Sequence, residues 1–140
     1  MSKIKVVYWS GTGNTETMAN AVVAGIVEKG GEAEALSVDT VKPEDLQGES
    51  VFALGCPSMG AEVLEEDEME PFVEAICGFA SGKKIVLFGS YDWGDGEWMR
   101  NWVERMEDAG AVVVGDGIIA NLEPDDEAIA SCKKAGMELV

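Results

Sequence analysis

The sequence contains no histidine and few basic residues. Histidine is the commonest general base and a common metal ligand, so chemistry that depends on it is excluded. Lysine and arginine number 10 against 27 aspartate and glutamate residues, which gives a net charge of −17. Nucleic acids and anionic membranes are both bound through clustered cations, so we expect neither as a partner. Charge of this sign suits docking to basic protein surfaces, although it also serves solubility alone.

Cysteines and long apolar runs are also scarce. Cys56, Cys77 and Cys132 are far apart and odd in number, so they form neither a zinc pattern nor a disulfide framework. We expect buried thiols in a reducing compartment. The N-terminal apolar run is too short for a signal peptide, and no run approaches the roughly 20 residues of a membrane helix. These features predict a cytoplasmic protein with a single domain over residues 1–140.

The hydrophobic pattern alternates between strand-like and helix-like segments. It predicts strands over 3–9, 32–38, 50–55, 83–90 and 111–120. It predicts helices over 14–29, from about 67–71 to 79, over 96–110 and within 123–140, with a helical turn or loop after Pro43. This order indicates the α/β class: a doubly wound, five-stranded parallel sheet with strand order 2-1-3-4-5. Ligands of such folds bind at the carboxyl ends of the strands. The loops 10–15, 56–64 and 89–97 begin at these ends.

The first of these loops, "SGTGNT" (10–15), joins a strand to a helix N-terminus. Backbone N–H groups there are unpaired and favour anions, and Gly11 and Gly13 let a ligand approach the backbone. A phosphate is the expected guest. The loop has no P-loop lysine, and Glu16 stands where the dinucleotide fingerprint needs glycine. The alternative is a plain helix cap.

The other two loops supply groups for a flat ring. Met59 is an apolar residue in a turn, Gly60 permits unusual backbone angles, and Glu62 offers a hydrogen-bond acceptor. Trp93 stands among glycines, outside any helical or strand period, as expected of a stacking platform or of a lid over the core. A ligand with a phosphate at one end and an amphipathic ring at the other is therefore predicted, and FMN fits this description. No catalytic residue set and no metal ligands are predicted.

The segments "VYWSGTGNTE", "LGCPSMGAEVLEE", "EPF" and "GKKIVLFGSYDWGDGEWM" closely resemble flavodoxins, in particular the short-chain type of anaerobic bacteria. The expected strand over 111–120 is uninterrupted, which resembles the short-chain form, because long-chain flavodoxins have a loop inserted there. The resemblance implies a low-potential one-electron carrier without substrate turnover of its own. Its tightly but non-covalently bound FMN would cycle between semiquinone and hydroquinone and pass electrons between redox enzymes.

The resemblance also implies a set of cofactor-binding residues. The phosphate would be held by Ser10, Gly11, Thr12, Gly13, Asn14 and Thr15. Met59, Gly60 and Ala61 would line the inner ring face, with Glu62 accepting from flavin N3, and Pro57 and Ser58 belong to the same cofactor-binding set. Trp93 would cover the outer face, with Ser90, Tyr91 and Gly94 completing the pocket. Two positions depart from the family pattern: Asp92 stands where relatives often have glycine, and Ala61 where they often have a polar residue.

An acidic run lies beside the expected ring site: Glu62, Glu65, Glu66, Asp67, Glu68 and Glu70. It is either a docking rim for basic faces of transient redox partners or a set of charges that favours a helix N-terminus. The carrier itself is expected to be a monomer. Three other functions are weighed: an FMN-dependent reductase, an FMN-binding module of a larger complex, and a phosphoacceptor receiver domain. The last needs an aspartate at the end of the third strand, where Cys56 stands.

Overall fold

The computed structural model describes residues 3–11, 13–60 and 62–140. Its first half contains β1 (Ile4–Tyr8), α1 (Asn14–Glu28), β2 (Ala33–Ser37), the 3-10 turn η1 (Val38–Thr40), α2 (Glu44–Gln47) and β3 (Val51–Gly55). Its second half contains α3 (Met69–Cys77), β4 (Lys84–Tyr91), α4 (Glu97–Asp108), β5 (Val112–Val113), β6 (Ile118–Asn121) and α5 (Asp126–Met137). The predicted alternation of strands and helices is confirmed, and the long helices lie within a few residues of their expected bounds.

The strands form one parallel sheet in the order β2-β1-β3-β4-β5, with β6 also paired to β4. Val6 in β1 lies opposite Ala35 of β2 on one side and opposite Ala53 of β3 on the other. The chain therefore crosses from one side of β1 to the other after β2. The doubly wound order is as predicted, and the ends of β1 and β3 form the switch point at which ligands of such folds bind.

The last strand differs from the prediction of one uninterrupted strand over 111–120. β5 and β6 are two short strands that pair with successive parts of β4. Gly115 and Gly117 lie between them with φ of 64° and 82°. These backbone angles suit glycine, and they take the chain out of the ladder and back into it. The fifth position in the sheet is therefore shared by two strands rather than filled by one.

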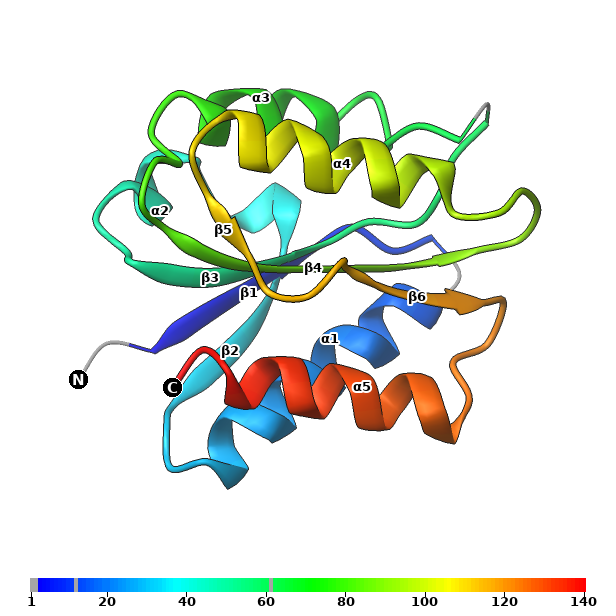
Figure 1. The fold of residues 1–140 in the computed structure, drawn as a ribbon, viewed down its shortest axis with the longest axis horizontal. Coiled ribbons are helices and arrows are strands. Elements are labelled where there is room, and N and C mark those ends of the chain that lie inside the picture. The colour runs from blue at the N-terminus through cyan, green and yellow to red at the C-terminus, as the bar shows by residue number, and fades with distance from the viewer. Residues whose placement is uncertain (1–2, 12, 61) are drawn as a thin grey trace.

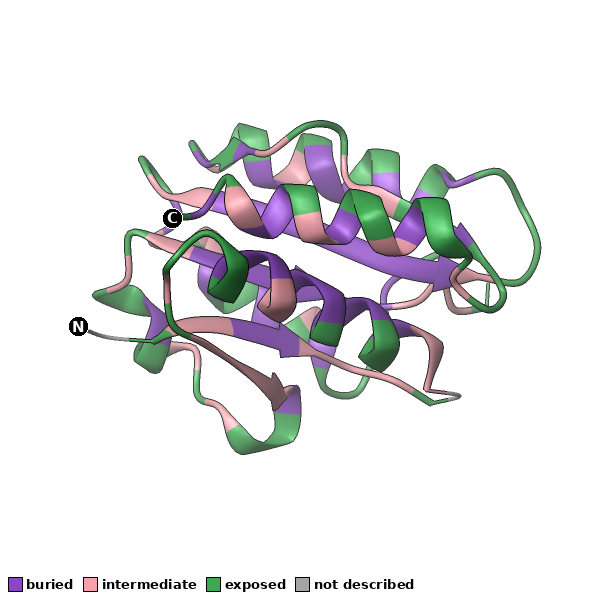
Figure 2. Cartoon of the chain, turned by 90° about the horizontal axis from the view of Figure 1, so that it is seen from below, coloured by how far each residue is buried: buried purple, intermediate pink, exposed green. Residues whose placement is uncertain are grey.

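Two helical layers cover the sheet, with α3 and α4 on one face and α1 and α5 on the other (Figure 1). Buried strand side chains alternate between the layers: Leu54 and Leu87 pack on the α3–α4 side, and Ala53 and Val86 on the α1–α5 side. Buried positions follow the sheet and the inner sides of the helices (Figure 2). The predicted inner faces are confirmed by the burial of Met18, Val22, Ile26, Trp98, Trp102, Val103, Met106, Cys132, Gly136 and Leu139, while Ile129 is half-buried.

The helices α1 and α5 touch through glycine. A Cβ atom on Gly136 would lie 2.2 Å from the carbonyl oxygen of Val22, and one on Gly25 would lie 1.9 Å from that of Lys133. Only a hydrogen atom fits at either position. This close contact fixes the layer that supports the N-terminus of α1.

The three cysteines are free, as expected, with Cys56 and Cys132 buried and Cys77 half-buried. Burial raises the pKa of Cys56 and of Cys132 to about 12, so both remain thiols at neutral pH. Within the part of the chain that the structure describes, no helix has the length and the hydropathy to cross a membrane.

Candidate functional site

Three loops leave the carboxyl ends of β1, β3 and β4 at the same edge of the sheet (Figure 1). Together with the residue after β6 they enclose a cavity of about 220 Å³. Its lining consists of Trp9, Gly11, Asn14, Pro57, Ser58, Met59, Ser90, Tyr91, Asp92 and Leu122. The cavity lies at the predicted place, and none of these described lining residues is basic.

The first loop is shaped around the start of α1. Gly13 is the N-cap residue, with φ of 95°, and its backbone N–H donates to Ser10 Oγ at 3.0 Å. The Gly13 carbonyl accepts from Thr17 Oγ1 at 3.0 Å. Gly11 packs against the Trp9 ring, where an added Cβ would lie 3.2 Å from the nearest ring atom. Thr12 lies outside the described residues. The loop therefore brings the N-terminal end of a helix to the cavity, as an anion site requires.

Thr15 ties the first loop to the third. Its side chain is 1% exposed, and its Oγ1 lies 3.1 Å from Ser90 Oγ and 3.4 Å from the Ser90 backbone nitrogen that donates to it. The hydroxyl pair joins the first turn of α1 to the end of β4. Thr15 and Ser90, two of the predicted binding residues, thus hold the first and third loops together beside the cavity.

The Tyr8 hydroxyl supports the start of α1 from the end of β1. It donates to Glu16 Oε2 at 3.0 Å. Burial and this bond to the Glu16 carboxylate raise the pKa of Tyr8 above its usual value. Tyr8 therefore stays protonated and keeps donating throughout the neutral range.

The second loop forms a tight hairpin after β3. Met59 N–H donates to the Val63 carbonyl at 2.8 Å, and Val63 N–H donates to the Met59 carbonyl at 3.0 Å. Gly60 and Glu62 have positive φ, at 47° and 55°. Ala61 lies outside the described residues. Ser58 N–H donates to the Ser90 carbonyl at 3.0 Å, so the base of the hairpin is fastened to β4 beside the cavity.

Glu62 faces the third loop rather than the cavity. Its Oε1 accepts from the backbone N–H of Glu97, the first residue of α4, at 3.1 Å. A Cβ atom on Gly94 would lie 2.5 Å from the Glu62 carboxylate, so glycine is needed there for the close approach. The carboxylate that was predicted to meet the ring of a ligand thus joins two loops at the rim of the site.

The aromatic residues in and after the third loop differ in burial and in whether they line the cavity. Tyr91 lines the cavity, and its ring centroid is 5.6 Å from that of Trp98. Trp98 is buried and donates from Nε1 to the Cys56 carbonyl at 3.1 Å, so it belongs to the core as expected. Trp93 is 59% exposed and lies outside the cavity lining. Its predicted stacking role remains a prediction.

Glu65 is a buried carboxylate that sequence reasoning did not separate from its exposed neighbours. It is 7% exposed and accepts backbone N–H bonds from Asp67, Glu68 and Met69 at 2.8, 2.8 and 2.9 Å. Its own N–H donates to Cys56 Sγ at 3.3 Å. Burial raises the pKa of Glu65, but the three N–H bonds outweigh it, and the net pKa lies below the usual value. Glu65 therefore closes the start of α3 as a charged group.

The rest of the acidic run divides into paired and exposed members. Glu70 binds both terminal nitrogens of Arg105, at 2.9 and 2.6 Å, and this bond raises the pKa of Arg105. Glu68 is exposed and accepts from Trp9 Nε1 at 3.3 Å, which places it beside the cavity. Glu66 and Asp67 are also exposed. Glu65 thus serves the start of the helix, as one interpretation of the run expected. Glu66, Asp67 and Glu68 form an exposed acidic rim, and its docking role remains a prediction.

The lining has the chemistry that a phosphorylated flat ring requires. Gly11 and Asn14 at the start of α1 and the hydroxyl residues Ser58 and Ser90 supply polar groups. Pro57, Met59 and Leu122 supply apolar surface. Within the described residues, no cluster of three or more cysteine, aspartate or glutamate side chains is arranged to hold a metal ion. The site therefore fits FMN. Sequence reasoning missed two lining residues, Trp9 and Leu122. It expected the Asp92 carboxylate beside the cofactor without counting it among the binding residues, and Asp92 lines the cavity.

Comparison with known proteins gives the family. The sequence model described as flavodoxin matches residues 6–136. A flavodoxin of Clostridium beijerinckii is 50% identical over 136 residues, covering 97% of this chain and 98% of that protein. A flavodoxin of Megasphaera elsdenii is 44% identical over 133 residues, covering 95% of each. The solution structure of two-electron reduced Megasphaera elsdenii flavodoxin superposes with a TM-score of 0.85 at 42% identity, covering 96% of each chain.

Flavodoxins bind FMN and carry electrons to redox partner proteins, and they turn over no substrate of their own. The agreement extends over nearly the whole chain and includes the three loops around the cavity. The chain therefore belongs to the flavodoxin family, as a short-chain, FMN-binding electron carrier.

Proposed function

We propose that residues 1–140 act as one FMN-binding domain that carries single electrons at low potential. FMN, when bound there, would supply the one-electron chemistry, between its semiquinone and hydroquinone forms. The observation that carries the proposal is the cavity itself. It lies at the switch point of the sheet, its described lining has no basic residue, and Asp92 is part of that lining.

Charge in and around the cavity favours a low potential. Adding an electron to the cofactor adds negative charge, which nearby carboxylates oppose. One carboxylate about 10 Å away in a water-like dielectric costs about 0.4 kcal/mol. For a one-electron couple this is roughly 20 mV. Asp92 at the cavity and Glu68 at its rim act together with the net charge of −17.

The phosphate end is assigned to the first loop. We infer that the phosphate is held by the backbone and side chains of Ser10, Gly11, Thr12, Gly13, Asn14 and Thr15. The N-terminus of α1 supplies the partial positive charge in place of a cation. A site without a lysine suits a cofactor that stays bound, because no phosphate is transferred and no cation is needed to stabilise a departing phosphate group.

The ring end is assigned to the second and third loops. The inner face would meet Pro57, Ser58, Met59, Gly60 and Ala61, and the outer face would meet Trp93, with Ser90, Tyr91 and Gly94 completing the enclosure. Glu62, which faces the third loop, would accept from flavin N3 with the oxygen that does not receive the Glu97 N–H. Gly60, at the tip of the hairpin, lowers the cost of reorienting the peptide that follows it.

Stepwise reduction of the purified, FMN-loaded protein tests the proposal. We expect two separate one-electron steps, a one-electron form that accumulates between them, and a second potential well below that of free FMN. Coincident steps, or a second potential equal to that of free FMN, would contradict it.

We further propose that the carrier is a cytoplasmic monomer that meets partners through basic faces. The exposed carboxylates of Glu66, Asp67 and Glu68 adjoin the cavity, because Glu68 accepts from the cavity residue Trp9. Such contacts are brief and are weakened by salt. The rate of electron transfer to a basic partner should therefore fall steeply with ionic strength, and a rate independent of salt would exclude this docking mode.

A further inference from the structure

The sheet has a free edge at β6. Within the described residues β6 pairs with β4 alone. The backbone N–H of Leu122 donates to the Tyr91 carbonyl in β4 at 2.7 Å. Since alternate residues of a parallel strand bond to the same side, the N–H and C=O groups of Ile119 and Asn121 point away from the sheet. Groups of this kind are a template for an added strand.

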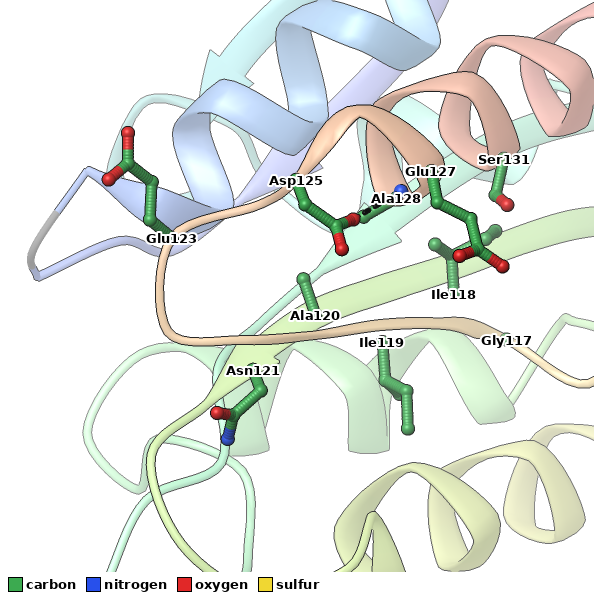
Figure 3. Close-up of a pocket in the computed structure, with 10 residues that line it drawn as sticks. All are labelled: Gly117, Ile118, Ile119, Ala120, Asn121, Glu123, Asp125, Glu127, Ala128 and Ser131. Atoms are coloured by element: carbon green, nitrogen blue, oxygen red, sulfur yellow. Dashed lines mark hydrogen bonds between the residues drawn. The ribbon is translucent and has the colours of Figure 1, made fainter.

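A groove follows this edge between β6 and α5 (Figure 3). Its first part has a volume of about 400 Å³ and is lined by residues 117–121 on the strand side and by Ala128 and Ser131 on the helix side. A second part of about 390 Å³ shares Gly117, Ile118 and Ser131 with the first and continues along α5 to Glu138. The groove is therefore long enough to take an extended chain beside β6.

The charge of the groove is mainly negative. Glu123, Asp125 and Glu127 border the first part (Figure 3). Asp125 caps α5 by accepting from Ala128 N–H at 2.8 Å. Glu123 and Glu127 are exposed and form no hydrogen bond or ion pair with the described residues. The second part adds Asp116, Glu138 and one cation, Lys134.

We propose that this groove binds an extended basic segment of a partner protein, which adds as a strand to the free edge of β6. Main-chain hydrogen bonds to Ile119 and Asn121 would hold the segment. Side chains project from alternate positions of a strand, so lysine or arginine at every second position would lie along the acidic border of the groove. There they would meet Glu123, which precedes α5, and Glu127 on α5. A second copy of this chain is a poor occupant, because it would bring two carboxylate rims together.

The groove and the cofactor cavity are neighbours along the chain. Asn121 lines the groove, and Leu122 lines the cavity. A strand added at β6 would therefore end beside the cofactor, on the side away from the acidic residues after β3. The proposal adds a second docking surface to the proposed carrier, and it holds or fails independently of the redox couple.

Amide NMR of the FMN-loaded protein tests the proposal. The probe is a short, end-blocked peptide of alternating lysine and valine. We expect shifts of the amides of Ile119 and Asn121 and of residues along α5, together with slower hydrogen exchange at these two edge amides. A peptide of the same composition with N-methyl groups at alternate positions should not bind, because it lacks the donors of a strand.

The variant Glu123→Gln with Glu127→Gln should weaken peptide binding about fivefold, as expected for the loss of two exposed ion pairs. The matched control is Glu74→Gln with Glu104→Gln, which removes the same charge from exposed positions on α3 and α4. It should change binding less than twofold. Equal weakening by both variants, equal binding of the N-methylated peptide, or shifts confined to residues 62–70 would overturn the proposal.

Discussion

The helices that follow β1 and β3, α1 and α3, begin at the same edge of the sheet but differ in what accepts the hydrogen bonds of their first N–H groups. The N-cap of α1 is Gly13, which has no side chain to offer. At α3 the Glu65 carboxylate receives three consecutive N–H groups. One helix start is thus closed by the protein's own anion, while the other adjoins the cavity to which we assign the cofactor phosphate. The unpaired N–H groups of a helix start thus serve structure at α3 and, in the proposed function, phosphate binding at α1.

The largest expected effect comes from placing a charge at the start of α1. Asn14→Asp puts a carboxylate at a cavity-lining position with almost no change of shape. Repulsion between charges about 4 Å apart near a surface is about 4 kcal/mol, which corresponds to a loss of FMN affinity of roughly a thousandfold. Fluorescence titration of the FMN-free protein with FMN measures it.

The matched control is Asn20→Asp, an exposed position further along α1, which should change the affinity only a few-fold. If Asn14→Asp binds FMN as well as the control does, the phosphate is not held at this helix start.

The next effect comes from opening the start of α3. Glu65→Ala leaves three N–H groups without their acceptor and should lower the free energy of unfolding by about 3 kcal/mol. Urea denaturation of the FMN-loaded protein measures the change. Glu66→Ala removes an exposed neighbouring carboxylate and should cost less than about 0.5 kcal/mol. Equal losses in the two variants would show that the bonds to Glu65 contribute little.

The contribution of Glu65 should also depend on pH. Its pKa in the folded state is below its usual value of about 4.3, so its charged form stabilises the fold. That stability is fully present above the unfolded-state pKa and is lost as the pH falls through the folded-state pKa. The difference in unfolding free energy between the native protein and Glu65→Gln should therefore be constant near neutral pH and shrink below about pH 4. A difference that grows on acidification would contradict the assigned direction.

The smallest effect sharpens the comparison at α1. Glu16 is an exposed carboxylate in the first turn of this helix. Glu16→Gln removes a negative charge near the proposed phosphate, so FMN should bind a few-fold more tightly, with a change of about 0.5 kcal/mol. The gain should disappear in high salt, because exposed charges are screened. A gain that persists in high salt would point to a change of shape instead.

The sequence predicted the fold well because its strands and helices alternate in clear hydrophobic patterns. The division of the last strand was missed, although the segment "GDG" (115–117) interrupts the apolar run and is a recognised turn signal. The long apolar stretch on both sides outweighed it. The structure gives Gly115 and Gly117 positive φ, which lies outside the backbone angles of a regular strand.

The sequence predicted which three loops form the site, but it did not predict which side chains contact one another there. Leu122 lines the cavity because the chain returns to β4 after the interruption, which the expectation of a single strand concealed. The pairing of Glu70 with Arg105 joins residues that are distant in the sequence. The burial of Glu65 depends on backbone direction, which composition does not reveal. Patterns along the chain locate loops, whereas the partners of each side chain depend on packing.

The position of Glu62 limits how the hairpin can move. At the tip, its carboxylate receives the first N–H of α4 from Glu97 and lies against Gly94. At the base, Trp98 of the same helix donates to the Cys56 carbonyl. The hairpin is thus bonded to α4 at both its tip and its base, so it cannot easily shift as a whole relative to this helix. In the proposed function, a change of cofactor charge would therefore meet a hairpin held at both ends, with little rearrangement of the surrounding chain to slow the transfer.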